Sequence, residues 1–250
     1  MTVTPFPGLV DSAPAPVFDI EKVLASIDTM AAQRPVAAQI VSVANSAYFG
    51  MRGRVMSLQF AVTVVGFTTV RTMATVALTN LDDESRLPGN FWEVTTSLAL
   101  ASSNLAPRFG ERPQDALCLG LLAQIGAALL NHNDPDGYAE IQAEHPTFRG
   151  RRAAEGRRYG INSLRLTSVA LEQWGFPHAL INPLKQVDDY QAFEGALLRG
   201  AFEVASRLTA DHARLPIEEV SCGQLRERDV PPILDQVRQD AEELRSAMLG

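Results

Sequence analysis

Five arginines form the densest group of chemically active side chains in the sequence. They are Arg149, Arg151, Arg152, Arg157 and Arg158. Guanidinium groups pair with phosphate and carboxylate through parallel hydrogen bonds, so such a cluster can bind an anion or an acidic partner. Helical spacing also places Arg151, Arg158 and the intervening Glu155 on one face, where they can form local salt bridges on a solvated helix. No glycine-rich phosphate loop accompanies the cluster, and both interpretations stay open.

The other candidate ligands and nucleophiles are scattered along the chain. The four histidines are His132, His145, His178 and His212. None of them pairs with another at i, i+3 or i, i+4 spacing, which predicts surface or capping roles. Cys118 and Cys222 lie far apart and fit no metal-binding pattern, as expected of two structural thiols in a reducing compartment. Ser46, Ser57 and Ser163 lack a histidine and an acid arranged for a nucleophilic triad.

The composition limits the class of protein. Of the 250 residues, 46% are hydrophobic and 20% are charged, which is typical of an ordinary globular protein. A formal net charge of −7 argues against bulk attraction to nucleic acid or to an anionic membrane. No apolar run reaches the roughly 18 residues that a membrane span requires. The N-terminal segment also lacks the basic and apolar regions of a secretory signal, so we predict a cytoplasmic protein.

Apolar side chains recur at helical spacing along almost the whole chain, and no segment alternates at period two for long enough to predict a strand. We predict an all-α fold in which an N-terminal helical bundle packs on a larger helical bundle. Residues 1–16 carry four prolines and are predicted to be a flexible lead-in. The polar segment 82–90 is expected to separate an N-terminal subdomain, residues 17–88, from a larger one, residues 89–250.

The larger subdomain is predicted to be a succession of helices. We expect them at about 90–107, 115–131, 137–144, 147–158, 162–174, 177–187, 191–209 and 231–248. The segment 115–131 is so apolar and rich in small residues that it should be central and buried. The turn from His132 to Gly137 has some features of a calcium-binding loop. Pro135 interrupts it, however, and Ala143 stands where such a loop places glutamate, so we predict a turn that caps the next helix.

The segment "NSAYFG", residues 45–50, ends an apolar helical run, and a second helix is expected from about Leu58. Gly50 is a natural helix stop, and Asn45 is expected to satisfy backbone groups at the helix end. Ser46 belongs to the same motif. Tyr48 and Phe49 have two interpretations. They can fill the joint between the two bundles, or they can form an exposed aromatic anchor for a partner protein.

Together with "SLQFAVTVVGFTTVR" at residues 57–71, "NSAYFG" closely resembles the signature of the HDOD family, bacterial regulatory domains related to the HD phosphohydrolases. The resemblance implies one HDOD domain over residues 17–250, with an HD-like second bundle. HD phosphohydrolases bind one or two divalent metals through His and Asp side chains from several helices. The metals polarise phosphate and generate hydroxide.

Four short segments resemble the frames that carry those ligands. They are "FW" at 91–92, "GLLAQIG" at 120–126, "E…RRYGINS" at 155–163 and "WGFP" at 174–177. The His-Asp pair that names the superfamily falls on Ala123 and Gln124. Two further ligand positions fall on Ser163 and near Val187, and no histidine follows the first frame. None of these residues offers an imidazole or a carboxylate, so we predict no metal, no cofactor and no metal-dependent hydrolysis at this site.

Three functions follow from these patterns. The first is a non-catalytic regulatory module that acts through protein–protein contacts in bacterial signal transduction. The resemblance implies cyclic-di-GMP turnover or two-component proteins as partners, and we expect them to be recruited in trans because 250 residues leave no room for a fused domain. The second is a sensor of a nucleotide or cyclic dinucleotide, held near the arginine cluster or in the vacated metal cavity. The third is a residual metal-dependent phosphohydrolase with a rearranged site.

Overall fold

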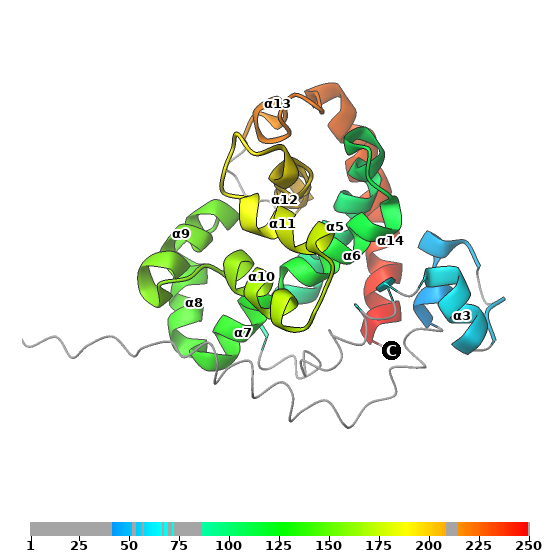
Figure 1. Ribbon diagram of the computed structural model, residues 1–250, viewed down its shortest axis with the longest axis horizontal. Coiled ribbons are helices and arrows are strands. Elements are labelled where there is room, and N and C mark those ends of the chain that lie inside the picture. The colour runs from blue at the N-terminus through cyan, green and yellow to red at the C-terminus, as the bar shows by residue number, and fades with distance from the viewer. Residues whose placement is uncertain are drawn as a thin grey trace, which may run out of the picture.

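The fold is described from a computed structural model of the chain. The structure describes residues 42–51, 54–56, 58–66, 68–69, 72, 87–208 and 215–249. All regular elements within these ranges are helices, which confirms the predicted all-α class (Figure 1). The predicted lead-in, Ser57 and His212 lie outside the described residues.

The helices, with 3-10 helices written as η, have the following bounds. They are η1 (Ala47–Phe49), α3 (Leu58–Val65), α5 (Phe91–Leu105), η3 (Ala106–Phe109), α6 (Pro113–Ala123), α7 (Ile125–Asn133), α8 (Pro135–Glu144), α9 (Phe148–Tyr159), α10 (Ser163–Gln173), α11 (His178–Gln186), η4 (Phe193–Gly195), α12 (Ala196–Leu208), α13 (Ile217–Val220), η5 (Glu227–Asp229) and α14 (Val230–Leu249). The helix predicted over 115–131 is buried as expected, but it is two helices that meet at Gln124. The short helix α13 was not predicted.

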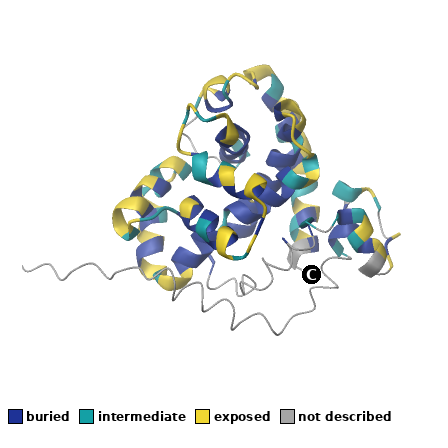
Figure 2. Ribbon diagram, viewed as in Figure 1, coloured by how far each residue is buried: buried dark blue, intermediate teal, exposed yellow. Residues whose placement is uncertain are grey.

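Helix α5 lies at the centre of the larger bundle and packs against α6, α12 and α14 (Figure 1). Nearly all of its residues are buried, and many of them are small (Figure 2). Small side chains let neighbouring backbones approach, and at Gly120 of α6 an added Cβ would lie 2.4 Å from the Cα of Ala99. Helices α5 and α6 therefore pack tightly at the centre, and α12 and α14 pack against α5.

Among the described residues, the stretch Pro113–Asn133, formed by α6 and α7, is long and apolar enough to cross a membrane by composition. The sequence analysis predicted a buried helix over 115–131 but found no apolar run long enough for a membrane span, and this stretch meets that length. Its most apolar window is 78% buried inside the protein. The apolarity of the stretch is accounted for by its place in the core.

The joint around "NSAYFG" contacts the larger bundle through η1, which packs on α14. The Tyr48 hydroxyl lies 2.5 Å from the Ser103 hydroxyl of α5. The ring of Phe49 meets that of Tyr48 edge to face at 4.8 Å, and both side chains are half-buried against the core. Burial raises the pKa of Tyr48, and the hydrogen bond with Ser103 opposes that shift. These contacts favour the interpretation that Tyr48 and Phe49 fill the joint.

Candidate functional site

The positions that correspond to the His-Asp pair lie where α6 ends and α7 begins. Ala123 is fully buried, and Gln124 links the two helices. The backbone N–H of Gly126 donates to the Thr167 hydroxyl of α10 at 2.8 Å. That hydroxyl lies 3.0 Å from the carbonyl oxygen of Ser163 and 3.3 Å from that of Ala123, either of which can accept its proton. The start of α7 is thus bound directly to α10.

Glu155, from the third frame, is 1% exposed and lies beneath the start of α10. One carboxylate oxygen accepts from the backbone N–H of Ser163 at 2.7 Å, and the other accepts from the Tyr138 hydroxyl at 2.9 Å. Burial, and then the charge of Glu155, raise the pKa of Tyr138 well above its ordinary value. Both oxygens of the one acidic side chain in these frames are therefore used in holding α8, α9 and α10 together.

This donor set does not fit a divalent metal. Ala123 and Val187 carry no donor atom, and Val187 is 1% exposed at the end of α11. Gln124 and Ser163 offer only neutral oxygens, which are weak substitutes for imidazole and carboxylate. Within the described ranges, no group of three His, Cys, Asp or Glu side chains is placed to hold a metal ion.

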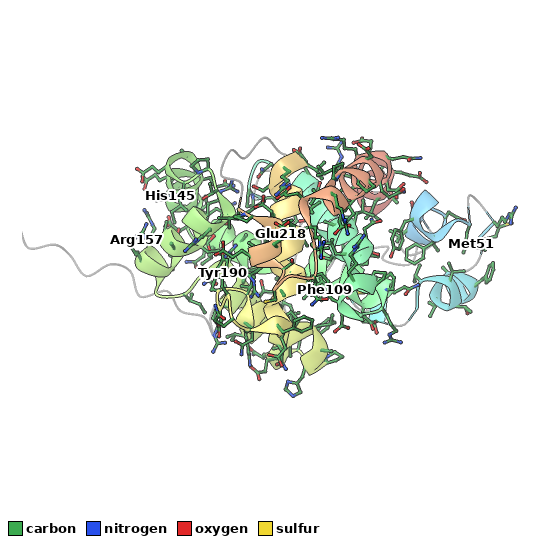
Figure 3. All side chains as sticks on the ribbon, turned by 90° about the horizontal axis from the view of Figure 1, so that it is seen from above. Met51, Phe109, His145, Arg157, Tyr190 and Glu218 are labelled. Carbon is green, nitrogen blue, oxygen red and sulfur yellow. The ribbon has the colours of Figure 1, made fainter. Side chains whose placement is uncertain are left out.

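The five arginines of α9 do not form one site. Arg151 donates to the carbonyl oxygens of His145 and Pro146 at 3.0 and 2.6 Å. Arg158 pairs with Asp134 at 3.1 Å and with Glu140 at 2.9 Å, and these carboxylates raise its pKa. Arg157 is exposed and lies at the outer edge of the molecule (Figure 3). Neither Arg151 nor Arg158 forms the expected local pair with Glu155, whose oxygens are bound to Tyr138 and Ser163.

Asp134 confirms the predicted turn before α8. Its carboxylate accepts from the backbone N–H of Gly137 at 3.1 Å and so caps the helix. It also accepts from the hydroxyl of Tyr159 at 3.2 Å. Burial and this carboxylate both raise the pKa of Tyr159.

Arg149 and Arg152 instead face α12 and line a cavity of about 220 Å³. A third arginine, Arg199 of α12, lines the same cavity and is 4% exposed. Sequence reasoning missed Arg199. The signal that could have found it is a lone arginine within the apolar run "ALLRGAF" at 196–202, since a charge is rarely buried without a specific reason.

Asn45 satisfies backbone groups, but not at the helix end where we expected it to act. Its side-chain amide donates to the carbonyl oxygen of Val55 at 2.8 Å, and its amide oxygen accepts from the Val55 N–H at 2.9 Å. Val55 lies ten residues further along the chain. The two hydrogen bonds therefore close the segment 45–55, which contains η1 and leads into α3. Gly50 lies inside this loop with a φ of +68°, where glycine is favoured. Ser46 is buried beside it.

Replacing Asn45 with alanine is expected to destabilise the protein by about 2 kcal/mol, because two hydrogen bonds to half-buried backbone groups are lost. The free energy of unfolding from urea titration measures this. Asn133→Ala, at the exposed end of α7, is the control, with an expected change of about 0.5 kcal/mol or less. Equal losses in the two variants would show that Asn45 does not close the loop.

Several solved structures share this fold. A proposed signal transduction protein from Marinobacter aquaeolei VT8 superposes with a TM-score of 0.69 at 19% identity, over 92% of this chain and 58% of that one. An HDOD domain protein of unknown function from Geobacter sulfurreducens gives 0.60 at 17% identity, over 94% and 87% of the two chains. A proposed phosphohydrolase from Shewanella amazonensis SB2B gives 0.60 at 19% identity, over 92% and 93%. No curated protein matches.

The HDOD domain family model matches residues 15–190, from the N-terminal subdomain to the end of the α11 region. All four ligand frames and the "NSAYFG" motif lie within this range. Helices α12 and α14 follow it and pack on α5. The chain belongs to the HDOD domain family.

Proposed function

We propose that this HDOD protein is a non-catalytic signal-transduction module that acts through contacts with other proteins. The observation that carries the proposal is the set of side chains at the ligand positions. Ala123 and Val187 are buried without a donor atom, and the neighbouring carboxylate of Glu155 is bound to Ser163 and Tyr138. A signalling role is in line with the family and with the fold shared with a proposed signal transduction protein.

A groove of about 200 Å³ beside α6 supports the protein-contact part of the proposal. It lies between α6, α11 and η4, and its walls include Phe109, Leu180 and Leu197. Phe193 on its edge is 51% exposed, with its ring 6.1 Å from that of Phe109. Exposed aromatic side chains beside an apolar groove are typical anchor points of protein interfaces.

Carboxylates surround this groove. Glu111, Asp115 and Glu194 line it, and Arg112 is paired with Asp115 at 2.6 Å. A partner segment that inserts an apolar side chain and carries Lys or Arg beside it would complement both features. The proposed partner is therefore a signalling protein with a basic, apolar-anchored contact segment, such as a cyclic-di-GMP turnover or two-component protein recruited in trans.

Capture from native cells with Phe193→Ser and Phe60→Ser variants tests the contact. Phe60 on α3 is similarly exposed, at 43%, and serves as the matched control. We expect a partner that is retained by the wild type and by Phe60→Ser but lost by folded Phe193→Ser, with weaker retention at high salt. Failure to retain any partner, or equal loss in both variants, would contradict the proposed contact.

The non-catalytic part has a separate test. The purified protein, supplied with Mn²⁺, Mg²⁺ or Fe²⁺, is expected to hydrolyse bis(4-nitrophenyl) phosphate no faster than the metal alone. A metal-dependent hydrolysis rate above that of the metal alone would show that a rearranged phosphohydrolase site exists, provided that the activity co-purifies with the protein.

A further inference from the structure

We propose that the cavity between α9 and α12 binds a small organic anion, a carboxylate or monophosphate attached to a compact apolar body. Its walls come from the start of α9, from Tyr190, from α12 and from residues 215–220. The cavity is separate from the Phe193 groove, and the proposal does not depend on the partner contact. Charge, an unpaired donor and size define the ligand.

Arg199 gives the cavity a buried positive charge that no carboxylate neutralises within the described part of the chain. Its five N–H groups donate to neutral acceptors. These are the carbonyl oxygens of Val220, Gln186, Asp189 and Ala192, at 2.9, 3.3, 2.7 and 2.8 Å, and Sγ of Cys222 at 3.2 Å. A buried charge that is stabilised by dipoles alone attracts a counter-ion. Arg199 therefore contributes charge to the cavity rather than a free donor.

Arg152 contributes the unpaired donor. This side chain is 9% exposed, its Nε donates to Asp188 at 3.0 Å, and its guanidinium lies over the ring of Phe202 at 5.2 Å. Nη1 is buried and has no hydrogen-bond partner among the described residues. Buried guanidinium nitrogens are almost always paired. Arg152 lines the cavity, so an anionic group bound there would supply an acceptor for this guanidinium.

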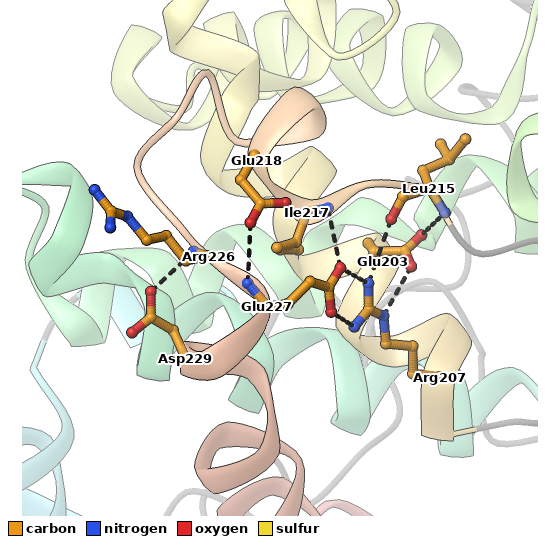
Figure 4. A network of polar contacts seen from close by, with 8 residues as sticks. All are labelled: Glu203, Arg207, Leu215, Ile217, Glu218, Arg226, Glu227 and Asp229. Carbon is orange, nitrogen blue, oxygen red and sulfur yellow. Dashed lines mark hydrogen bonds and ion pairs between the residues drawn. The ribbon is translucent and has the colours of Figure 1, made fainter.

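The remaining charges favour an anion as well. Arg149 is exposed at the mouth, has no ion pair within the described ranges, and lies over the ring of Tyr190 at 5.4 Å. Glu203 is the carboxylate in the lining, and Arg207 holds it at 2.8 Å, with the Leu215 N–H donating to its other oxygen at 3.2 Å (Figure 4). The negative charge is thus bound within the protein, while Arg149 can turn toward a ligand.

Size and lining define the rest of the ligand. Phe148, Phe202, Leu215 and Val220 supply apolar walls. A cavity of about 220 Å³ is smaller than the roughly 300–1,000 Å³ of sites for drug-sized ligands. It is too small for a whole cyclic dinucleotide and matches an acid built on a single ring.

Benzoate and phenyl phosphate are the probes, titrated into the ¹⁵N-labelled full chain by NMR. We expect saturable binding with a dissociation constant of about 1 mM or lower, and shifts centred on residues 147–152 and Tyr190. Inorganic phosphate lacks the apolar body, and benzyl alcohol lacks the negative charge, so these two probes test whether binding needs each feature. Both should bind about tenfold more weakly or not at all.

The variant pair is Arg149→Gln and Arg157→Gln, two exposed arginines of the same helix. Arg149→Gln should weaken binding about tenfold, and Arg157→Gln should leave it within about twofold. Since both side chains are exposed, folding is not at risk. The proposal fails if neither acid saturates, if benzyl alcohol or inorganic phosphate binds as well as the acids, if the shifts map elsewhere, or if both variants lose binding equally.

Discussion

Replacing Gly126 with alanine is expected to destabilise the domain by about 3–6 kcal/mol, a large share of the stability of a typical protein. A Cβ at this position would lie 1.9 Å from the carbonyl oxygen of Ser163 and 2.8 Å from the Thr167 hydroxyl. The first of these is a backbone atom, so the start of α7 would have to move away from α10. That movement would also break the Gly126–Thr167 hydrogen bond.

Two further variants separate the causes of this loss. Thr167→Val keeps the shape but removes the hydroxyl, and it should cost about 1–3 kcal/mol. Gly156→Ala lies on the exposed side of α9, where an added Cβ meets nothing within 4 Å, and it should stabilise the protein by about 0.5–1 kcal/mol. Urea unfolding of all three measures the differences. If Gly126→Ala costs no more than Thr167→Val, the helices do not approach as closely as described.

The close contact at Gly126 also shows why one helix boundary could not be predicted. The apolar period continues through 115–131, and glutamine is a good helix former, so nothing local marks the break at Gln124. The break accompanies contact with α10, forty residues further along the chain. Helix α13 was missed for a different reason, because four residues are too few to show a period.

The arrangement of the candidate-site residues could also be predicted only in part from the sequence. Ala123 and Gln124 lie at the end of α6, Ser163 at the start of α10 and Val187 directly after α11, and their assignment as ligand positions stays a prediction from the frames. Sequence spacing could not tell which arginines of α9 meet. Arg149 and Arg152 turn toward α12, while Arg151 donates to backbone carbonyls before α9 and Arg158 pairs with the carboxylate of Asp134. The third member of the cavity, Arg199, is held by carbonyls of α13 and of the segment between α11 and η4, which only the tertiary structure brings together.

Glu155→Ala is expected to destabilise the protein by about 3–5 kcal/mol, because two buried donors lose their acceptor at once. The donors are the Ser163 N–H at the start of α10 and the Tyr138 hydroxyl of α8. An anionic acceptor at a helix N-terminus is also favoured by the helix dipole. The loss should appear as a lower midpoint in urea with an unchanged slope.

Glu155→Gln distinguishes this structural role from a role in metal binding. A glutamine can accept from Ser163 with its oxygen and donate to the Tyr138 oxygen with its nitrogen, so it should cost only about 1 kcal/mol. Tyr138→Phe removes one donor, and combining it with Glu155→Ala in a double-mutant cycle measures the coupling between the two side chains. A coupling near zero would show that the pair does not interact. A metal-binding role predicts a different result. Glu155→Gln would then be as unstable as Glu155→Ala, and Mn²⁺ would raise the free energy of unfolding of the wild type but of neither variant.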